Sequence, residues 1–135
     1  MKLLYRYIFA IFIFFIIAII GCEDTLTNSD IDKIIIPSKD VSYNEYIQPV
    51  LNVKCSTSGC HDDATRAGDY SVTNWANVVM PGIVDPGNVE TSRMVWRIEG
   101  IGVELMPPIG SLVMPLTKNQ IDGIKTWIRE GAKNN

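Results

Sequence analysis

The sequence predicts a small, mostly α-helical domain that contains long loops. Two segments begin with a helix-capping pattern and continue with apolar residues at a spacing of three to four, which is typical of amphipathic helices. No run of alternating polar and apolar residues is long enough to indicate a sheet. Turns that contain Pro and Gly separate the candidate helices, so the expected fold class is all-α and rich in loops.

The chain of 135 residues opens on an apolar leader. Lys2 and Arg6 precede 14 consecutive aliphatic or aromatic residues, from 7 to 20, and this order is typical of an export signal. Residues 19–22, Ile-Ile-Gly-Cys, resemble a bacterial lipobox. The resemblance implies a signal peptide over residues 1–21 and a lipid on Cys22. The alternative is a retained membrane anchor, although a spanning helix needs ~20 apolar residues.

Either form of the leader places the rest of the chain in the cell envelope, facing the periplasm or the cell exterior. An anchor of two or more acyl chains would hold it stably at a membrane. The formal net charge of the whole chain is −3, and loss of Lys2 and Arg6 with the leader makes the remainder more acidic. Because Lys and Arg form no cluster, a nucleic-acid partner is not expected.

Residues 22–40 are expected to form a lipid-anchored tether, and residues 41–135 to form the folded domain. The tether is mostly polar and turn-forming, and its one apolar cluster is Ile34, Ile35 and Ile36. These isoleucines could instead lie on the domain as a short extended segment. The sequence leaves both possibilities open.

The first helix of the domain is expected to follow Ser42. Ser42 and Glu45 have the spacing of a capping box, and Pro49 must either kink the helix or occupy its first turn. The apolar side of this helix is expected to consist of Tyr43, Tyr46, Ile47, Val50 and Leu51.

A second capping box, Thr117 and Gln120, predicts the last helix, which Gly131 is expected to end. Two shorter helices are expected over residues 73–79 and 92–98. The apolar stripe of the last helix is Ile121, Ile124, Trp127 and Ile128.

The predicted core is thin, because few short helices must cover a domain of this size. The domain nevertheless contains many large aromatic rings. Each ring taken separately is explained by ordinary core packing, whereas a large apolar cofactor would explain all of them together. The rings are those of Trp75, Trp96, Trp127, Tyr43, Tyr46 and Tyr70.

Two cysteines and the only histidine form one short segment, Cys55 to His61, in which Cys60 directly precedes His61. Covalent attachment of c-type haem needs two thiols for its vinyl groups and an adjacent imidazole for its iron. Four residues separate these cysteines, where two are usual. A disulfide in an oxidising compartment is the main alternative. A structural zinc site lacks a fourth ligand of the usual type.

A haem bound by His61 would need a second axial ligand, and with one histidine in the chain only a methionine is plausible. Met94 falls within a predicted helix and is expected in the core. Met80, Met106 and Met114 each precede a proline, which favours a stiff, extended loop. Met106 is the preferred ligand because two prolines follow it, and Met114 is the second choice.

The order of these motifs, from Tyr46 to Ala132, resembles a small monohaem cytochrome c domain of the planctomycete type. That family implies one covalent haem c on Cys55 and Cys60, with His61 and Met106 as iron ligands. Two features depart from its pattern: the spacing of the cysteines and the extra residues 111–115, which keep Met114 under consideration. The resemblance rests on residues 47–51, 55–61, 86–87, 92–93, 106–108, 116–117, 120–121 and 127–132.

A haem with His and Met on its two faces has no open position for a substrate, so the expected function is one-electron transfer rather than catalysis. The acidic body favours redox partners with a basic docking patch, met in transient encounters. The alternative is a disulfide-stapled envelope lipoprotein that binds a carbohydrate, peptide or protein without a cofactor. Haem catalysis or ligand sensing would need a distal acid–base group, for which no second histidine is present.

Overall fold

The structure is a computed structural model that describes residues 6–7 and 26–135. The predicted signal peptide, apart from residues 6 and 7, and the predicted lipid-attachment residue Cys22 lie outside the described part. Within that part, no helix has both the length and the apolar character needed to cross a bilayer. Its main elements are α2 (Asn28–Ile31), the π-helical turn η1 (Tyr43–Ile47), α3 (Gln48–Lys54), the 3₁₀ turn η2 (Ala67–Asp69), α4 (Trp75–Val78), α5 (Arg93–Glu99) and α6 (Lys118–Arg129).

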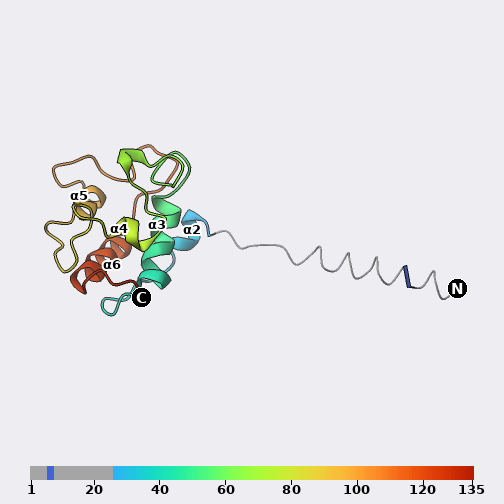
Figure 1. Cartoon of the computed structure of the whole chain (residues 1–135), viewed down its shortest axis with the longest axis horizontal. Helices are drawn as coiled ribbons and strands as arrows, with labels where there is room; N and C mark the ends of the chain where they lie inside the picture. Colours follow the sequence, from blue (N-terminus) through green and yellow to red (C-terminus); the bar gives the residue numbers. More distant parts are fainter. Residues whose placement is uncertain (1–5, 8–25) are drawn as a thin grey trace.

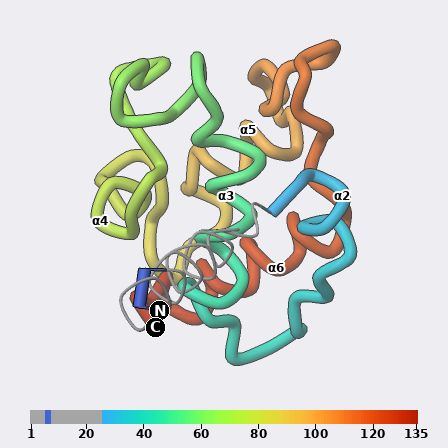
Figure 2. Tube along the Cα trace, turned by 90° about the vertical axis from the view of Figure 1, so that its right-hand side faces the viewer, coloured from blue at the N-terminus to red at the C-terminus, as the bar shows by residue number. Residues whose placement is uncertain are grey.

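The elements agree with the all-α prediction. Among the described residues the only β-type pairing is an isolated bridge between Asp85 and Asn88. The longest helix, α6, contacts α5 and η1, and α2 packs on α3 (Figure 1). The chain end lies beside η1, where the Asn44 N–H donates to the Asn135 carbonyl at 2.9 Å. Long loops connect the short helices and form one side of the molecule (Figure 2).

The first helix begins where the sequence predicts, but its first turn is wider than an α-helical turn. Ser42 is the N-cap and its Oγ accepts from the Glu45 N–H at 3.2 Å. The π-helical turn η1 runs directly into α3, and Pro49 lies in the first turn of α3, a position that suits proline. The second of the two expectations for Pro49 is therefore confirmed.

The predicted last helix is also confirmed. Thr117 Oγ1 accepts from the Gln120 N–H at 3.2 Å, and Gln120 Oε1 accepts from the Thr117 N–H at 2.9 Å, which completes the capping box. The helix ends at Arg129, two residues before Gly131, whose φ of 97° is readily available only to glycine. Its apolar stripe enters the core, where Ile124, Trp127 and Ile128 are fully buried.

The two middle helices form close to the predicted positions. Asn74 caps α4 through its side chain, so this helix begins two residues later than predicted. Ser92 is the N-cap residue of α5, but its Oγ donates to the Asn88 carbonyl at 2.7 Å and accepts from the Asp85 N–H at 2.9 Å. It therefore stabilises the preceding turn instead of the helix end.

Most of the large aromatic rings belong to the protein core. Tyr43 and Trp127 are buried and stack with their centroids 5.2 Å apart. Trp75 fixes the chain end by donating from Nε1 to the Ala132 carbonyl at 2.7 Å. Of the six rings singled out in the sequence, only that of Tyr70 lines the large cavity described below. Ordinary packing therefore accounts for Tyr43 and Trp127, and a cofactor is not needed to explain the whole set.

Most of the predicted tether, from Thr27 onward, packs on the domain, so the boundary predicted at residue 41 lies earlier in the chain. Ile31 and Ile36 are buried, and the side chain of Asn119 binds both the N–H of Ile36, at 2.8 Å, and its carbonyl, at 3.0 Å. Gln120 Nε2 donates to the Ile31 carbonyl at 3.2 Å. The polar residues of this segment thus provide caps and hydrogen bonds rather than flexibility, and the packed domain begins at about Thr27.

Gly123 allows this N-terminal segment to approach α6. A Cβ at this position would lie 2.6 Å from Ile36 Cγ2 and 3.0 Å from Ile36 Cβ, so the backbone that carries Ile36 would have to move. We expect Gly123→Ala to destabilise the protein by about 1–2 kcal/mol, because the clash exceeds the ~1 kcal/mol that alanine contributes in a helix. Chemical denaturation measures this change in the free energy of unfolding.

A double-mutant cycle checks the cause. Ile36→Ala removes the two atoms nearest to the new Cβ, Cγ2 and Cδ1, and leaves only Cβ at 3.0 Å, so most of the cost of Gly123→Ala should disappear in that background. In a Val78→Ala background, which also truncates a buried residue, the cost should remain. Equal costs in both backgrounds would contradict the proposed contact between residues 36 and 123.

Candidate functional site

A cavity of about 340 Å³ opens between the loop after α3, helix α5 and the loop before α6. Figure 2 shows the two loops, residues 55–70 in green and residues 100–115 in orange, rising side by side beyond α3 and α5. The lining is mostly apolar, and its volume lies in the range usual for ligand sites. Its chemistry-bearing residues are Lys54, Cys55, Cys60, His61, Tyr70, Arg93, Arg97 and Met106.

The cysteine segment forms a closed turn at the end of α3. The Cys55 N–H donates to the Leu51 carbonyl at 2.9 Å, and the His61 N–H donates to the Cys55 carbonyl at 3.0 Å. Inside this turn the Cys60 N–H donates to the Thr57 carbonyl at 2.9 Å, and Gly59 adopts a φ of 86°. The four intervening residues thus fold back on themselves. Both sulfurs and the imidazole reach the same cavity in spite of the longer spacing.

Both cysteines of this segment are free thiols in the structure, so the disulfide alternative is not realised in it. Loss of water around the Cys55 sulfur raises the pKa of that thiol to about 12; Cys60 adds to the shift and the Lys54 cation opposes it. Cys55 is therefore a neutral thiol at physiological pH. Thr57 Oγ1 donates to the Cys60 sulfur at 3.4 Å, which fixes the second thiol within the turn.

The His61 ring is held from its outer side. Its Nδ1 lies 3.4 Å from the Tyr70 carbonyl oxygen, and because a carbonyl can only accept, a hydrogen bond here requires the proton on Nδ1. Nε2 then retains its lone pair, as a metal ligand requires. The Tyr70 ring packs against the imidazole with centroids 4.7 Å apart, and burial raises the pKa of its hydroxyl, so this ring stays neutral.

Met106 reaches the same cavity from the loop between α5 and α6. Its N–H donates to the Arg97 carbonyl at 2.7 Å, which ties the loop to α5, and its peptide bond to Pro107 is cis. Met94 also lines the cavity and is buried in the core, as the sequence predicts. Met80 and Met114 are 40% and 55% exposed and do not contribute to the lining. The structure therefore brings Met106, and not Met114, together with His61.

Three charged cavity residues, Lys54, Arg93 and Arg97, were not identified from the sequence. Arg93 and Arg97 are four residues apart on α5, so they lie on one face of that helix, and both line the cavity. Neither forms an ion pair with any described carboxylate, although Arg97 Nη1 donates to the Glu104 carbonyl at 3.4 Å. Their i, i+4 spacing is a signal, but exposed arginines with this spacing are common on helices.

Residues 58–110 match the sequence model of a protein family described as Planctomycete cytochrome C. This range contains Cys60, His61, both cavity arginines and Met106, and it begins three residues after Cys55. The chain has no significant match among the curated proteins or the solved structures.

The cavity brings together the groups that the resemblance implies: two thiols and one imidazole from the segment after α3, and one thioether from the loop before α6. The family is also the one that the order of sequence motifs indicates. Residues 58–110 thus match the planctomycete cytochrome c family, and a cytochrome c domain implies haem c as its cofactor.

Proposed function

We propose that this protein is a c-type cytochrome that carries single electrons in the cell envelope through a haem ligated by His61 and Met106. One observation supports the proposal above all others. Cys55, Cys60, His61 and Met106, which are spread over 52 positions of the chain, line the same apolar cavity.

Each of these side chains has a separate task in the proposed site. The thiols of Cys55 and Cys60 would hold the porphyrin covalently, because each S–H bond could add across a vinyl C=C double bond to give one C–S and one C–H bond. His61 provides Nε2, held ready by the contact between its Nδ1 and the Tyr70 carbonyl. Met106 provides its thioether from a loop fixed on α5. When bound, haem supplies a one-electron couple between Fe(II) and Fe(III).

The cavity explains why the proposed function is electron transfer rather than catalysis. With both His61 and Met106 bound to the iron, no position would remain for a substrate, and the thioether would favour the reduced state more than a second imidazole. The apolar lining keeps water away from the site. No second histidine in the chain can act as an acid or base opposite His61.

Arg93 and Arg97 fit the polar edge of this cofactor. Haem carries two carboxylate side chains, and guanidinium groups bind carboxylates through paired hydrogen bonds. Two cations that face a mostly apolar cavity without an ionic partner among the described residues suit a ligand that is apolar and doubly acidic. We therefore assign the two propionates to these arginines.

A lipid on Cys22 would hold the domain close to a membrane. The packed domain begins at Thr27, so only four residues separate the lipid-attachment residue from the folded part. Five extended residue steps span at most ~17 Å. The acidic protein would meet partners that carry a basic docking patch. We propose that the domain exchanges electrons with envelope proteins close to the membrane surface.

Covalent haem is the first expectation to test. In a host with c-type maturation, the wild-type protein should show sharp reduced absorption bands and retain one haem per chain in a denaturing intact-mass measurement. The double variant Cys55→Ser/Cys60→Ser should retain none, because no other cysteine lines the cavity. Cys22→Ser is the matched control and should keep its haem. A colourless wild-type protein with a Cys55–Cys60 disulfide would contradict the proposal and favour a cofactor-free binding protein.

The identity of the distal ligand gives a second prediction. Met106→Ala should abolish the charge-transfer absorption of the sulfur–Fe(III) bond, allow carbon monoxide to bind the reduced protein, and lower the reduction potential, since axial ligands set haem potentials over ~0.8 V. Met114→Ala should change none of these, because Met114 is exposed outside the cavity. The assignment would be wrong if Met114→Ala, and not Met106→Ala, removed the band.

The propionate assignment can be tested through the pH dependence of the potential. Guanidinium groups lower the pKa of bound carboxyls, so Arg93→Gln and Arg97→Gln should each move the propionate-linked change in potential to higher pH. Loss of one charge-assisted hydrogen bond should also cost the haem-containing protein about 1–3 kcal/mol of stability. Arg129→Gln, an exposed change on α6, is the control. If the pH dependence of the potential in both variants coincided with that of the control, the assignment of the propionates to these arginines would be wrong.

A further inference from the structure

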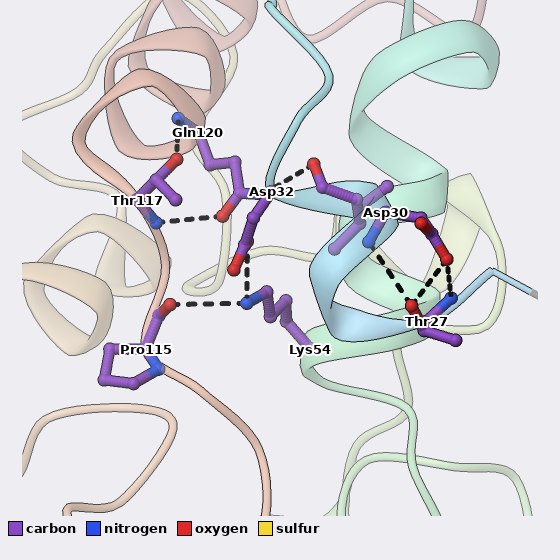
Figure 3. A network of polar contacts seen from close by, with 8 residues as sticks. Thr27, Asp30, Asp32, Lys54, Pro115, Thr117 and Gln120 are labelled. Atoms are coloured by element: carbon purple, nitrogen blue, oxygen red, sulfur yellow. Dashed lines mark hydrogen bonds and ion pairs between the residues drawn. The ribbon is translucent and has the colours of Figure 1, made fainter.

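Lys54 is a buried cation at the point where three distant segments meet (Figure 3). Its side chain is 0% exposed, and its Nζ lies 2.8 Å from Asp32 Oδ1, in the segment after α2. The same Nζ donates to the Pro115 carbonyl at 3.4 Å, at the end of the loop that carries Met106. The ammonium group thus joins α3 to segments that lie before and after it in the chain.

Asp32 is itself fixed by the last helix. Gln120 Nε2 donates to Asp32 Oδ1 at 3.0 Å, and the Gln120 Oε1 accepts from the N–H of Thr117 in the capping box of α6 (Figure 3). The Asp32 side chain is 20% exposed, whereas Lys54 is fully enclosed. A buried charge without a partner is strongly unfavourable, so Lys54 holds the Asp32 segment in place as firmly as Asp32 holds Lys54.

The position of this ion pair connects it to the cavity. Lys54 lines the cavity and directly precedes Cys55, whereas Asp32 does not contribute to the lining. Val113, in the loop that carries Met106, lines the cavity, and Pro115 lies two residues after it. One ammonium group therefore bridges the wall that carries the thiols and the loop that carries the thioether.

We propose that Lys54 is a positioning residue for the cofactor and an electrostatic determinant of its reduction potential, and that Asp32 sets the strength of both effects. This inference rests on the proposed function. Lys54 holds the end of the Met106 loop against the cysteine wall, and it lines the cavity, so its buried charge lies close to the cofactor site. Asp32 keeps that charge in place and partly offsets it from the far side.

The two charges act on the potential with opposite signs. Oxidation adds one positive charge at the iron, which a nearby cation opposes and a nearby anion favours. Loss of the Lys54 charge should therefore lower the reduction potential, and loss of the Asp32 charge should raise it. A role that is only structural has a different signature, because loosening the site exposes it to water in either variant and moves both potentials in the same direction.

The test compares Lys54→Met and Asp32→Asn with the wild-type protein, each loaded with haem. We expect opposite changes in the reduction equilibrium constant, each on the order of tenfold. Lys54→Met should also weaken the sulfur–Fe(III) absorption and reduce the folding equilibrium constant by roughly a hundredfold. Asp32→Asn keeps an oxygen that can accept from Lys54 Nζ and from Gln120, so this variant should fold. If Lys54→Met does not fold, the direction of the potential shift in Asp32→Asn tests the inference alone.

A matched ion pair outside the cavity is the control. Lys125 and Glu99 join α6 to α5 with a separation of 2.8 Å, and neither residue lines the cavity. Lys125→Met and Glu99→Gln should leave the potential and the absorption band close to those of the wild type. Shifts of Lys54→Met and Asp32→Asn in the same direction, or no larger than those of the controls, would overturn the inference and leave the proposed function intact. A wild-type protein without haem would overturn both.

Discussion

The site depends on one backbone hydrogen bond, from the His61 N–H to the Cys55 carbonyl. A helix end leaves its last carbonyls without partners, and here the chain returns six residues later to satisfy one of them. This closure turns the cysteine segment back against the end of α3. Because Cys60 precedes His61 directly, two thiols and one imidazole are placed on one wall, whatever the number of residues inside the turn. The opposite wall is built on the same principle, with the Met106 N–H bonded to the Arg97 carbonyl near the end of α5.

These two backbone hydrogen bonds fix the loops that contain the site residues to the ends of α3 and α5. The core beneath them consists of α3, α5 and α6 with the Tyr43–Trp127 pair, and it is formed by residues that do not line the cavity, apart from Leu51, Met94 and Ile98. Lys54 reaches from this core to both sides of the cavity. The helical half thus fixes the position of the loop half through backbone hydrogen bonds and one buried ion pair.

The features that could be predicted from the sequence are those whose interacting residues lie close together along the chain. Pattern alone located the N-cap at Ser42, the capping box at Thr117 and the local order of cysteines and histidine, because each involves residues within a few positions of one another. The docking of residues 27–36 could not be predicted in this way. Their partners, Asn119 and Gln120, lie more than 80 positions away, and a polar composition is shared by free linkers and by segments that use polar groups to dock. The choice between Met106 and Met114 likewise needed the course of the loop.

The aromatic residues turn out to be weak evidence for a cofactor. Their number in a thin-cored domain suggested a cofactor, yet Tyr43 and Trp127 stack on each other and Trp75 binds the chain end. The cavity is apolar instead because of aliphatic side chains, Met94 and Pro107. The apolar cavity is therefore a stronger indication of a cofactor than the aromatic rings. The protein has enough bulky residues to fill this cavity, but it packs most of their rings outside it. The arginines and Lys54 around this surface give it the polarity that a large, acidic and otherwise apolar ligand requires.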